Sequence, residues 1–231
     1  MIYGSGMFAT SFSDCFKNNP NICIFASGVS NSMCKDLAEF DREKKLLIKI
    51  IESNQCVSSF IYFSTCSIED RRKKNTPYVK HKLEMESIVL EHPGCLVFRL
   101  PQVVGFGGNP NTLMNFLYQS IKDGIEFKLL KHSNRNIIDI DDVLSIISFY
   151  VKNNFIRQKI INIANPVNYS MIEIVTSMEK FLKKNGIYDV TEKGNSYSID
   201  ISEISPIIKE TNVTFDKHYL PRIIKKYYSS V

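Results

Sequence analysis

The sequence predicts an α/β fold in which helices cover both faces of a parallel sheet. In the first half of the chain, short apolar runs of strand length alternate with segments whose apolar residues recur at helical spacing. Glycines directly after the first run predict a tight strand-to-helix turn. After residue 107 the alternation becomes less regular. We therefore expect a sheet-forming part at 1–107 and a mixed part at 108–231 with interleaved core elements, packed together as one compact unit.

The expected elements of the first part alternate between strand and helix. Runs rich in β-branched and aromatic residues predict strands, and amphipathic periodicity predicts helices. In chain order we expect a strand and turn at 1–6, a helix at 7–16, a strand at 21–28, a helix at 35–54, a strand at 58–65, a helix at 79–92 and a strand at 94–105.

The second part is expected to hold further helices and shorter strands. Asp142 follows a strand-like run and is expected to cap a helix rather than to act as an acid. Gly186 is expected to stop a helix, and a polar, turn-rich tail follows it. The expected elements are a helix at 111–123, a strand at 125–130, a turn and helix within 135–153, a strand at 159–165, a helix at 170–186 and a short final helix at 220–228.

Composition narrows the class of protein. The chain has 231 residues, 44% of them hydrophobic, and a formal net charge of +5. Its longest apolar runs fall short of the ~20 residues that a membrane helix needs, and it opens without a leader pattern. The six cysteines lack metal-ligand spacing, and the basic run at 71–74 lacks interleaved aromatic residues. We expect a cytoplasmic protein with reduced, mostly buried thiols, a solvated basic face, and no metal, nucleic-acid or membrane partner.

The turn "GSGMFA" at 4–9 has the form GxGxxA between a strand and a helix. In such a turn the first glycine, Gly4, permits a sharp bend, and the second, Gly6, lets the backbone approach a pyrophosphate at the helix N-terminus. The small Ala9 lets helix and strand pack closely. The pattern therefore indicates a dinucleotide site, although glycines at such a turn are about as often purely structural.

Tyr78 and Lys82 lie four residues apart just after Pro77, so a helix places them on one face, one turn apart. An ammonium within a few ångströms of a phenol favours the phenolate and lowers the pKa by about one to three pH units. A tyrosine tuned in this way can give or take a proton. The alternative is a pair on an exposed helix face that binds only water.

The chain resembles the extended short-chain dehydrogenases/reductases, in particular the nucleotide-sugar epimerase/dehydratase group. The resemblance spans nearly the whole chain, and the order of its motifs is more specific than any one of them. The segments that carry it are "GSGMFA", "IFASGVSNS", "FIYFSTCSI", "PYVKHKLEME", "FRLPQVVGFGG", "RNIIDIDDV" and "INIANPVNYSMIEIVTSM".

This resemblance implies a Rossmann-like dinucleotide-binding part at 1–107, a substrate-binding part at 108–231, and NAD or NADP as cofactor. It implies that Tyr78 donates the proton, that Lys82 tunes it and holds the cofactor ribose, and that Thr65 binds the substrate oxygen. The cofactor contacts that it implies, beside Tyr78 and Lys82, are Gly4, Ser5, Gly6, Met7, Phe8, Ala26, Ser27, Gly28 and Pro101. The substrate contacts that it implies are Asn31, Gln102 and Arg135, the last of them at a diphosphate.

One strand–helix–strand unit of the family is missing. Ile24, which begins "IFASG", follows Gly6 by only 18 residues, enough for one helix and a turn. In the family, the residue that contacts the adenosine ribose lies on the missing strand, so the sequence leaves NAD and NADP undecided. The missing unit also keeps open a relative that binds a ligand without turnover.

The function that the resemblance favours is reduction of a nucleotide-activated 4-keto-6-deoxy hexose, as in polysaccharide biosynthesis. A 4-epimerase of the same group and a non-catalytic ligand-binding relative stay open as alternatives. A Cys66 nucleophile with His81 as its base is a less favoured alternative, because no third group is evident to orient it. Relatives commonly form homodimers through the helices expected here at 35–53 and 78–92.

Overall fold

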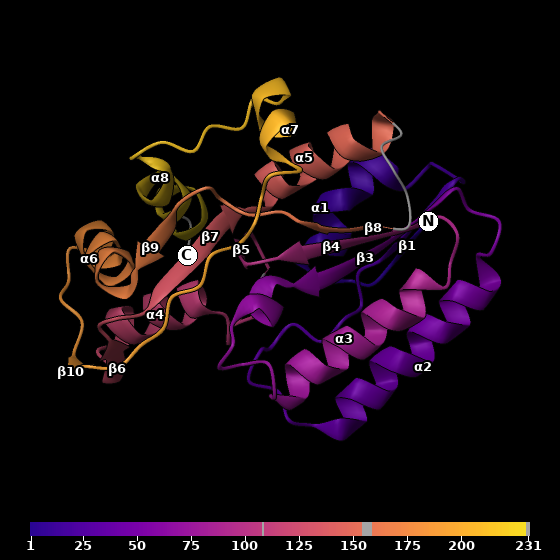
Figure 1. Cartoon of the computed structure of the whole chain (residues 1–231). Helices are drawn as coiled ribbons and strands as arrows, with labels where there is room; N and C mark the ends of the chain where they lie inside the picture. Colours follow the sequence, from indigo (N-terminus) through magenta and orange to yellow (C-terminus); the bar gives the residue numbers. More distant parts are fainter. Residues whose placement is uncertain (108, 154–158, 230–231) are drawn as a thin grey trace.

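The central sheet of the computed structural model is parallel and five-stranded, in the order β1-β2-β3-β4-β8 (Figure 1). The structure describes residues 1–107, 109–153 and 159–229, so Gly108 of the resembling segment lies outside it. The α/β class expected from the sequence is confirmed. The strands are β1 (Ile2–Tyr3), β2 (Ile22–Phe25), β3 (Ser59–Thr65), β4 (Cys95–Leu100) and β8 (Lys159–Asn162).

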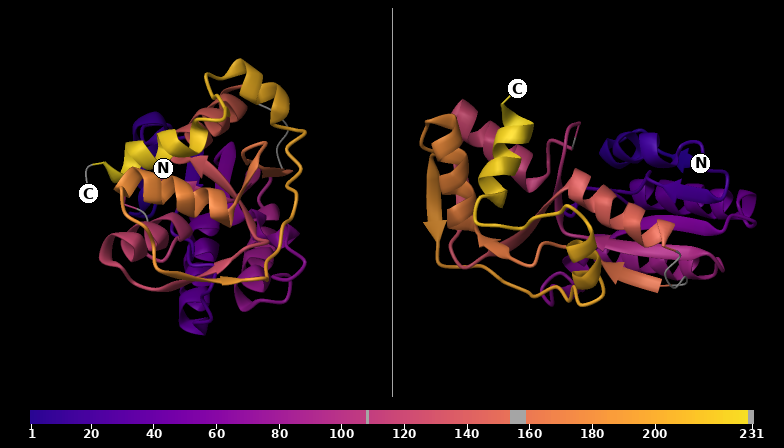
Figure 2. Two further views of the ribbon diagram at one scale, coloured as in Figure 1. Left: turned by 90° about the vertical axis from the view of Figure 1, so that its left-hand side faces the viewer. Right: turned by 90° about the horizontal axis from the view of Figure 1, so that it is seen from above.

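Helices pack on both faces of this sheet and form a three-layer arrangement (Figures 1 and 2). Alternate strand residues point to opposite faces: Ile24 and Ile61 join an apolar cluster with α1 and α5, whereas Phe25 and Tyr62 join a second cluster with α2 and α3. The four helices are α1 (Met7–Phe16), α2 (Leu37–Ser53), α3 (Pro77–Leu90) and α5 (Ile140–Lys152).

The connections between strands show where the chain lacks the strand–helix–strand unit that the sequence predicted to be missing. Successive strands advance in one direction across the sheet, but α1 and α5 cross one face while α2 and α3 cross the other. The connection through α1 therefore has the opposite hand to those through α2 and α3. Helix α1 runs directly into β2, and within the described residues no strand pairs with the outer edge of β1.

The rest of the chain forms a second region beside the carboxyl ends of the sheet strands (Figure 1). A three-stranded sheet joins β5 (Gln102–Val104), β7 (Asn134–Asp139) and β9 (Asn168–Ser170), and β6 (Phe127–Leu130) pairs with β10 (Tyr188–Thr191). The apolar cluster on the α1 side continues without a break into this region. Its helices are α4 (Leu113–Asp123), α6 (Met171–Leu182) and α8 (Tyr219–Tyr228), whereas α7 (Ser205–Glu210) packs on α5.

Several element boundaries differ from the sequence predictions. Helix α6 ends at Leu182, with Lys183 in the left-handed region at φ 51°, so Gly186 does not stop it. Asp139, not Asp142, caps α5 by accepting a hydrogen bond from the Asp141 backbone N–H. The expected strand at 94–105 is two strands in different sheets, which part at Pro101. Strand β10 and helix α7 lie in the polar tail, where only turns were expected.

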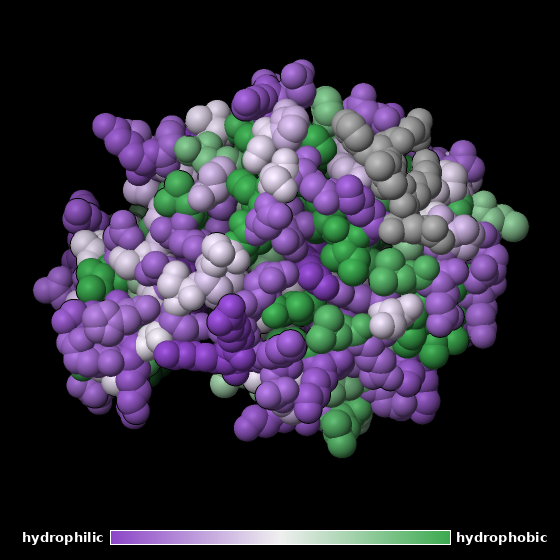
Figure 3. Space-filling model, viewed as in Figure 1, coloured by the Kyte–Doolittle hydropathy of each residue, from purple (hydrophilic) through white to green (hydrophobic). Residues whose placement is uncertain are grey.

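Polar side chains cover much of the face shown in Figure 3. All six cysteines are free; three are buried, whereas Cys15 and Cys56 are exposed, so fewer thiols are buried than the sequence predicted. Within the described ranges, no helix combines the length and apolar character that crossing a membrane requires.

Candidate active site

A cavity of about 720 Å³ opens where the carboxyl ends of the sheet strands meet the second region. The turn after β1, the ends of β2 and β3, the start of α3, the β4–β5 junction and α4 all contribute to its lining. In open parallel sheets this edge is where ligands bind, because the loops there converge on a crevice. The cavity is therefore the candidate active site.

The glycine turn forms one wall of the cavity. Gly4 has φ +139°, and a Cβ there would lie 2.4 Å from the Ala26 carbonyl oxygen, so this position requires glycine. Gly6 is the N-cap of α1, and a Cβ there would meet nothing within 4 Å. Phe8 packs on Phe63 of β3 with the ring centroids 4.7 Å apart. The turn thus presents open backbone N–H groups at the start of a helix, as a phosphate site needs.

Most of the residues predicted from the sequence line this one cavity, and four do not. Ser5 lines a separate cavity of about 320 Å³, and the Asn31 side chain accepts a hydrogen bond from the Met33 N–H within a local turn. Gly4 and Ser27 are also absent from the lining of the large cavity. The predicted residues that line the cavity are Gly6, Met7, Phe8, Ala26, Gly28, Thr65, Tyr78, Lys82, Pro101, Gln102 and Arg135.

Tyr78 is held at the cavity by the first turn of α3. Pro77 occupies the first helical turn and the Thr76 hydroxyl caps it by accepting from the Val79 N–H, so the helix begins one residue before the tyrosine. Thr65, at the end of β3, lines the same cavity. Burial raises the pKa of Tyr78 well above its ordinary range; a hydrogen bond with Thr65 opposes this, and the Glu43 charge adds to it.

Lys82, which was predicted to lower the pKa of Tyr78, is paired with a buried carboxylate in the protein. Lys82 Nζ lies 2.9 Å from Glu43 Oε1 and donates to the Tyr62 hydroxyl at 3.0 Å. Glu43 has no exposed surface and Lys82 is 2% exposed. The ammonium thus reaches the cavity already paired with an opposite charge, which offsets its effect on the phenol.

Glu43 has four polar partners from three parts of the chain: the loop after β2, strand β3 and helix α3. It accepts hydrogen bonds from the Val29 N–H at 2.6 Å and from the Tyr62 hydroxyl at 2.7 Å, and His81 Nε2 lies 3.0 Å away. Burial would raise the pKa of Glu43, but Lys82, His81 and Val29 outweigh it and lower the pKa to about 2. Sequence reasoning missed this residue. A signal existed, because Glu43 lies on the same face of α2 as the buried Phe40 and Leu47.

Two cations, Arg135 and Lys73, line the cavity. Arg135 of β7 donates through Nη1 to the Asn134 carbonyl at 2.8 Å, and Lys73 comes from the basic run that was expected to be solvated. Burial and the nearby charge of Arg135 lower the pKa of Lys73. Among the salt bridges of the described residues, neither has a carboxylate partner. Two partly buried positive charges that share a cavity favour an anionic ligand there.

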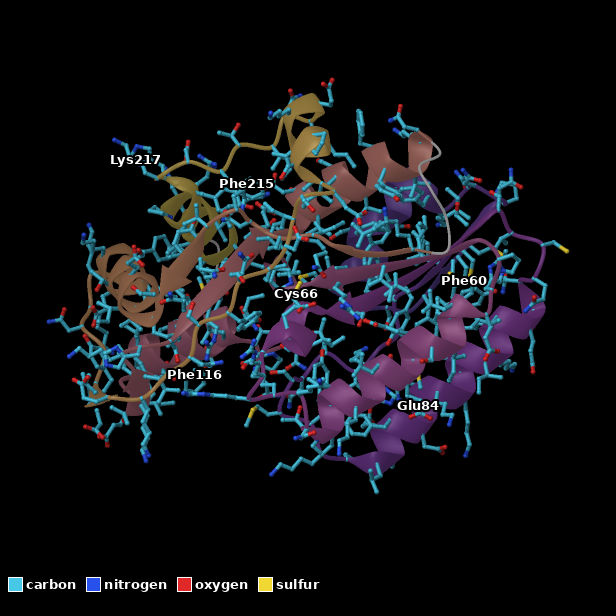
Figure 4. The ribbon with its side chains drawn as sticks, viewed as in Figure 1. Phe60, Cys66, Glu84, Phe116, Phe215 and Lys217 are labelled. Atoms are coloured by element: carbon cyan, nitrogen blue, oxygen red, sulfur yellow. The ribbon has the colours of Figure 1, made fainter. Side chains whose placement is uncertain are left out.

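The arrangement of Cys66 and His81 argues against a thiol nucleophile. Cys66 is buried between the sheet and the second region (Figure 4), where its thiol donates to the Arg99 carbonyl. Burial raises the pKa of Cys66 far above its ordinary value, which leaves little thiolate. His81 instead contacts Glu43 and stacks on Phe40 with the ring centroids 4.5 Å apart. The two residues do not form a nucleophile–base pair.

No protein-family model and no curated protein matches this sequence. The structure is similar to UDP-glucuronic acid 4-epimerase from Bacillus cereus in complex with NAD, with a TM-score of 0.74 and 17% identity over 94% of this chain and 78% of the other. It is also similar to MoeE5 in complex with UDP-glucose and NAD (0.74, 15%, 99% and 86%) and to RMD from Pseudomonas aeruginosa complexed with NADPH (0.71, 15%, 99% and 87%).

The fold is therefore that of the NAD-dependent nucleotide-sugar epimerases and dehydratases, as the sequence motifs implied. The neighbours are complexed with NAD or NADPH.

Proposed function

We propose that the protein is an NAD(P)-dependent oxidoreductase that reduces the keto group of a nucleotide-activated sugar, most readily a 4-keto-6-deoxy hexose. The observation that supports this best is the meeting of Gly6, Thr65, Tyr78 and Lys82 at one cavity, although three different elements supply them. The solved structures that share the fold carry NAD, NADPH or UDP-glucose.

The residues present fit the nicotinamide half of a dinucleotide. The open backbone at Gly6 and the N-terminus of α1 suit a pyrophosphate, and Ala26 and Pro101 offer small or apolar walls. Lys82 uses two of its three N–H donors on Glu43 and Tyr62, which leaves one for a ribose hydroxyl. When bound, the reduced nicotinamide supplies a hydride to the carbonyl carbon.

In the proposed reaction, the chain binds the substrate and delivers the proton. The Tyr78 hydroxyl gives its proton to the carbonyl oxygen as negative charge develops there, and the Thr65 hydroxyl donates a hydrogen bond to the same atom. The phenolate then regains a proton from water. Arg135 and Lys73 hold the diphosphate of the nucleotide, and Gln102 faces the sugar.

Oxidation of NADPH and NADH in the presence of a nucleotide-linked 4-keto-6-deoxy sugar tests this proposal. We expect a loss of absorbance at 340 nm matched mole for mole by a 4-hydroxy sugar, and at least a hundredfold loss of turnover in Tyr78→Phe. A 4-epimerase is the second candidate, because one neighbour is UDP-glucuronic acid 4-epimerase. Interconversion of two nucleotide sugars without net consumption of reduced cofactor would favour it over the reductase.

A further inference from the structure

We propose that Glu43 is a positioning residue which holds the Lys82 ammonium at the cavity and offsets its charge through a buried ion pair, so that Tyr78 serves as a proton donor. This inference rests on the proposed function and concerns the protonation state of Tyr78 before the substrate binds. Reduction needs a phenol that gives up a proton to the substrate oxygen, whereas oxidation of an alcohol needs a phenolate that accepts one.

The geometry of the pair supports this role. Lys82 Nζ and Glu43 Oε1 are 2.9 Å apart with both side chains almost fully buried, so water does not screen them. The Tyr62 hydroxyl donates to the same carboxylate oxygen and accepts from the same ammonium, which closes a three-membered network. The pair thus fixes where the Lys82 nitrogen lies before any ligand binds.

The loop after β2 is built around this pair. The Val29 N–H donates to the second oxygen of Glu43, and a Cβ at Gly28 would lie 2.8 Å from Lys82 Nζ and 2.9 Å from Glu43 Oε1. Gly28 and Lys82 both line the cavity. Glu43 therefore links the loop after β2, helix α2 and helix α3 through one carboxylate, without itself lining the cavity.

The charges around Tyr78 give the electrostatic consequence. The Glu43 carboxylate offsets the charge of the Lys82 ammonium, so the lysine stabilises a phenolate less than an unpaired ammonium would. Arg135 and Lys73 line the same cavity. The other groups that interact electrostatically with Tyr78 are Thr65, Cys34, Cys66 and Tyr62.

Direct titration of Tyr78 tests the inference without cofactor or substrate. The protein is labelled with ¹³C at the tyrosine Cζ, the Tyr78 signal is assigned by its loss in Tyr78→Phe, and its shift is followed against pH. In the wild type we expect a phenol signal up to pH values above the ordinary tyrosine range. In Glu43→Gln the titration should begin about one to three pH units lower, because the Lys82 charge is no longer offset.

A double variant keeps the test decisive if Glu43→Gln alone does not fold. Glu43→Gln with Lys82→Met removes both charges together, which proteins tolerate better than one unpaired buried charge. We expect its Tyr78 signal to titrate as in the wild type, within about half a pH unit, since the net charge of the pair is zero in both. Glu52→Gln, on an exposed position of α2, is the matched control and should change nothing.

Two results would overturn the inference: a Tyr78 titration that is the same in Glu43→Gln as in the wild type, or a double variant whose Tyr78 signal titrates a full pH unit or more above the wild type. The second would show that Lys82 tunes the phenol despite its partner. Because these titrations need no ligand, failure of the protein to bind NADH or NADPH would remove the proposed reaction separately.

Discussion

Breaking the pair between Lys82 and Glu43 from one side should destabilise the protein strongly. In Lys82→Met the side chain keeps its length and loses its charge, and the Glu43 carboxylate stays fully buried with its main cationic partner gone. Removing one partner of a buried ion pair costs about 3–5 kcal/mol, while removing both is often close to neutral. Against a typical total stability of about 5–15 kcal/mol, a loss of this size is easily measured.

The same two helices supply a matched control. Lys44 of α2 pairs with Glu84 of α3 at 2.5 Å, but their side chains are 42% and 50% exposed. Exposed pairs of this kind contribute about 0.2–1 kcal/mol because water screens them. Comparing the coupling free energies of the two pairs therefore separates the effect of burial from the effect of proximity alone.

Urea unfolding at pH 7, followed by circular dichroism, measures both double-mutant cycles. The variants are Lys82→Met, Glu43→Gln and their combination, then Lys44→Met, Glu84→Gln and their combination. We expect a coupling free energy of about 3 kcal/mol for the buried pair and below about 1 kcal/mol for the exposed one. Coupling below about 1 kcal/mol for both pairs would refute the buried ion pair.

Three further results are expected. Lys73→Gln should weaken the binding of uridine diphosphate about tenfold by calorimetry, since it removes one charged hydrogen bond. The variant of its exposed neighbour, Lys74→Gln, should leave the affinity within about twofold. Equal effects of the two substitutions would contradict a diphosphate site at Lys73. The dissociation constants of NADH and NADPH, measured by fluorescence titration, should lie within about tenfold of each other. The reason is that no described strand lies beyond β1 to carry a residue that selects the adenosine ribose. A preference of about a hundredfold for either dinucleotide would contradict this expectation. Glu43, with its pKa lowered from 4.5 to about 2, should contribute stability on the order of 3 kcal/mol. This contribution is complete above pH 4.5 and is lost as the pH falls toward 2. If the melting temperature fell as steeply with acid in Glu43→Gln as in the wild type, Glu43 would not be the group responsible.

The sequence predicted the layered sheet well because its signals were local. Each strand from β2 to β4 is a short apolar run, and α2 carries clear helical periodicity. The prediction for the tail was wrong because the signal there is not local. Strand β10 is half-exposed and pairs with β6, and its own residues give no sign of this pairing. Lys183 ended α6 in place of the expected glycine, so a residue of ordinary helix propensity took the left-handed position.

The sequence predicted most of the residues that line the candidate site, but it did not predict the buried charge that pairs with Lys82. Motif order identified Tyr78, Lys82 and Thr65, and the fold brings all three to one cavity. The partner of Lys82 lies 39 residues away on another helix, and only the tertiary packing of α2 on α3 places Glu43 beside it. The pKa of Tyr78 is raised, first because the phenol is buried and then because of the Glu43 charge, and spacing along the sequence reports neither of these causes.

Whether the cavity binds a reduced nicotinamide dinucleotide against Lys82 can be measured by a fluorescence titration of the purified protein with NADH and NADPH. We expect saturable binding of at least one of them with one site per chain, weakened at least tenfold in the Glu43→Gln/Lys82→Met double variant. The absence of saturable binding of either dinucleotide would show that the protein shares the fold of these enzymes without their chemistry.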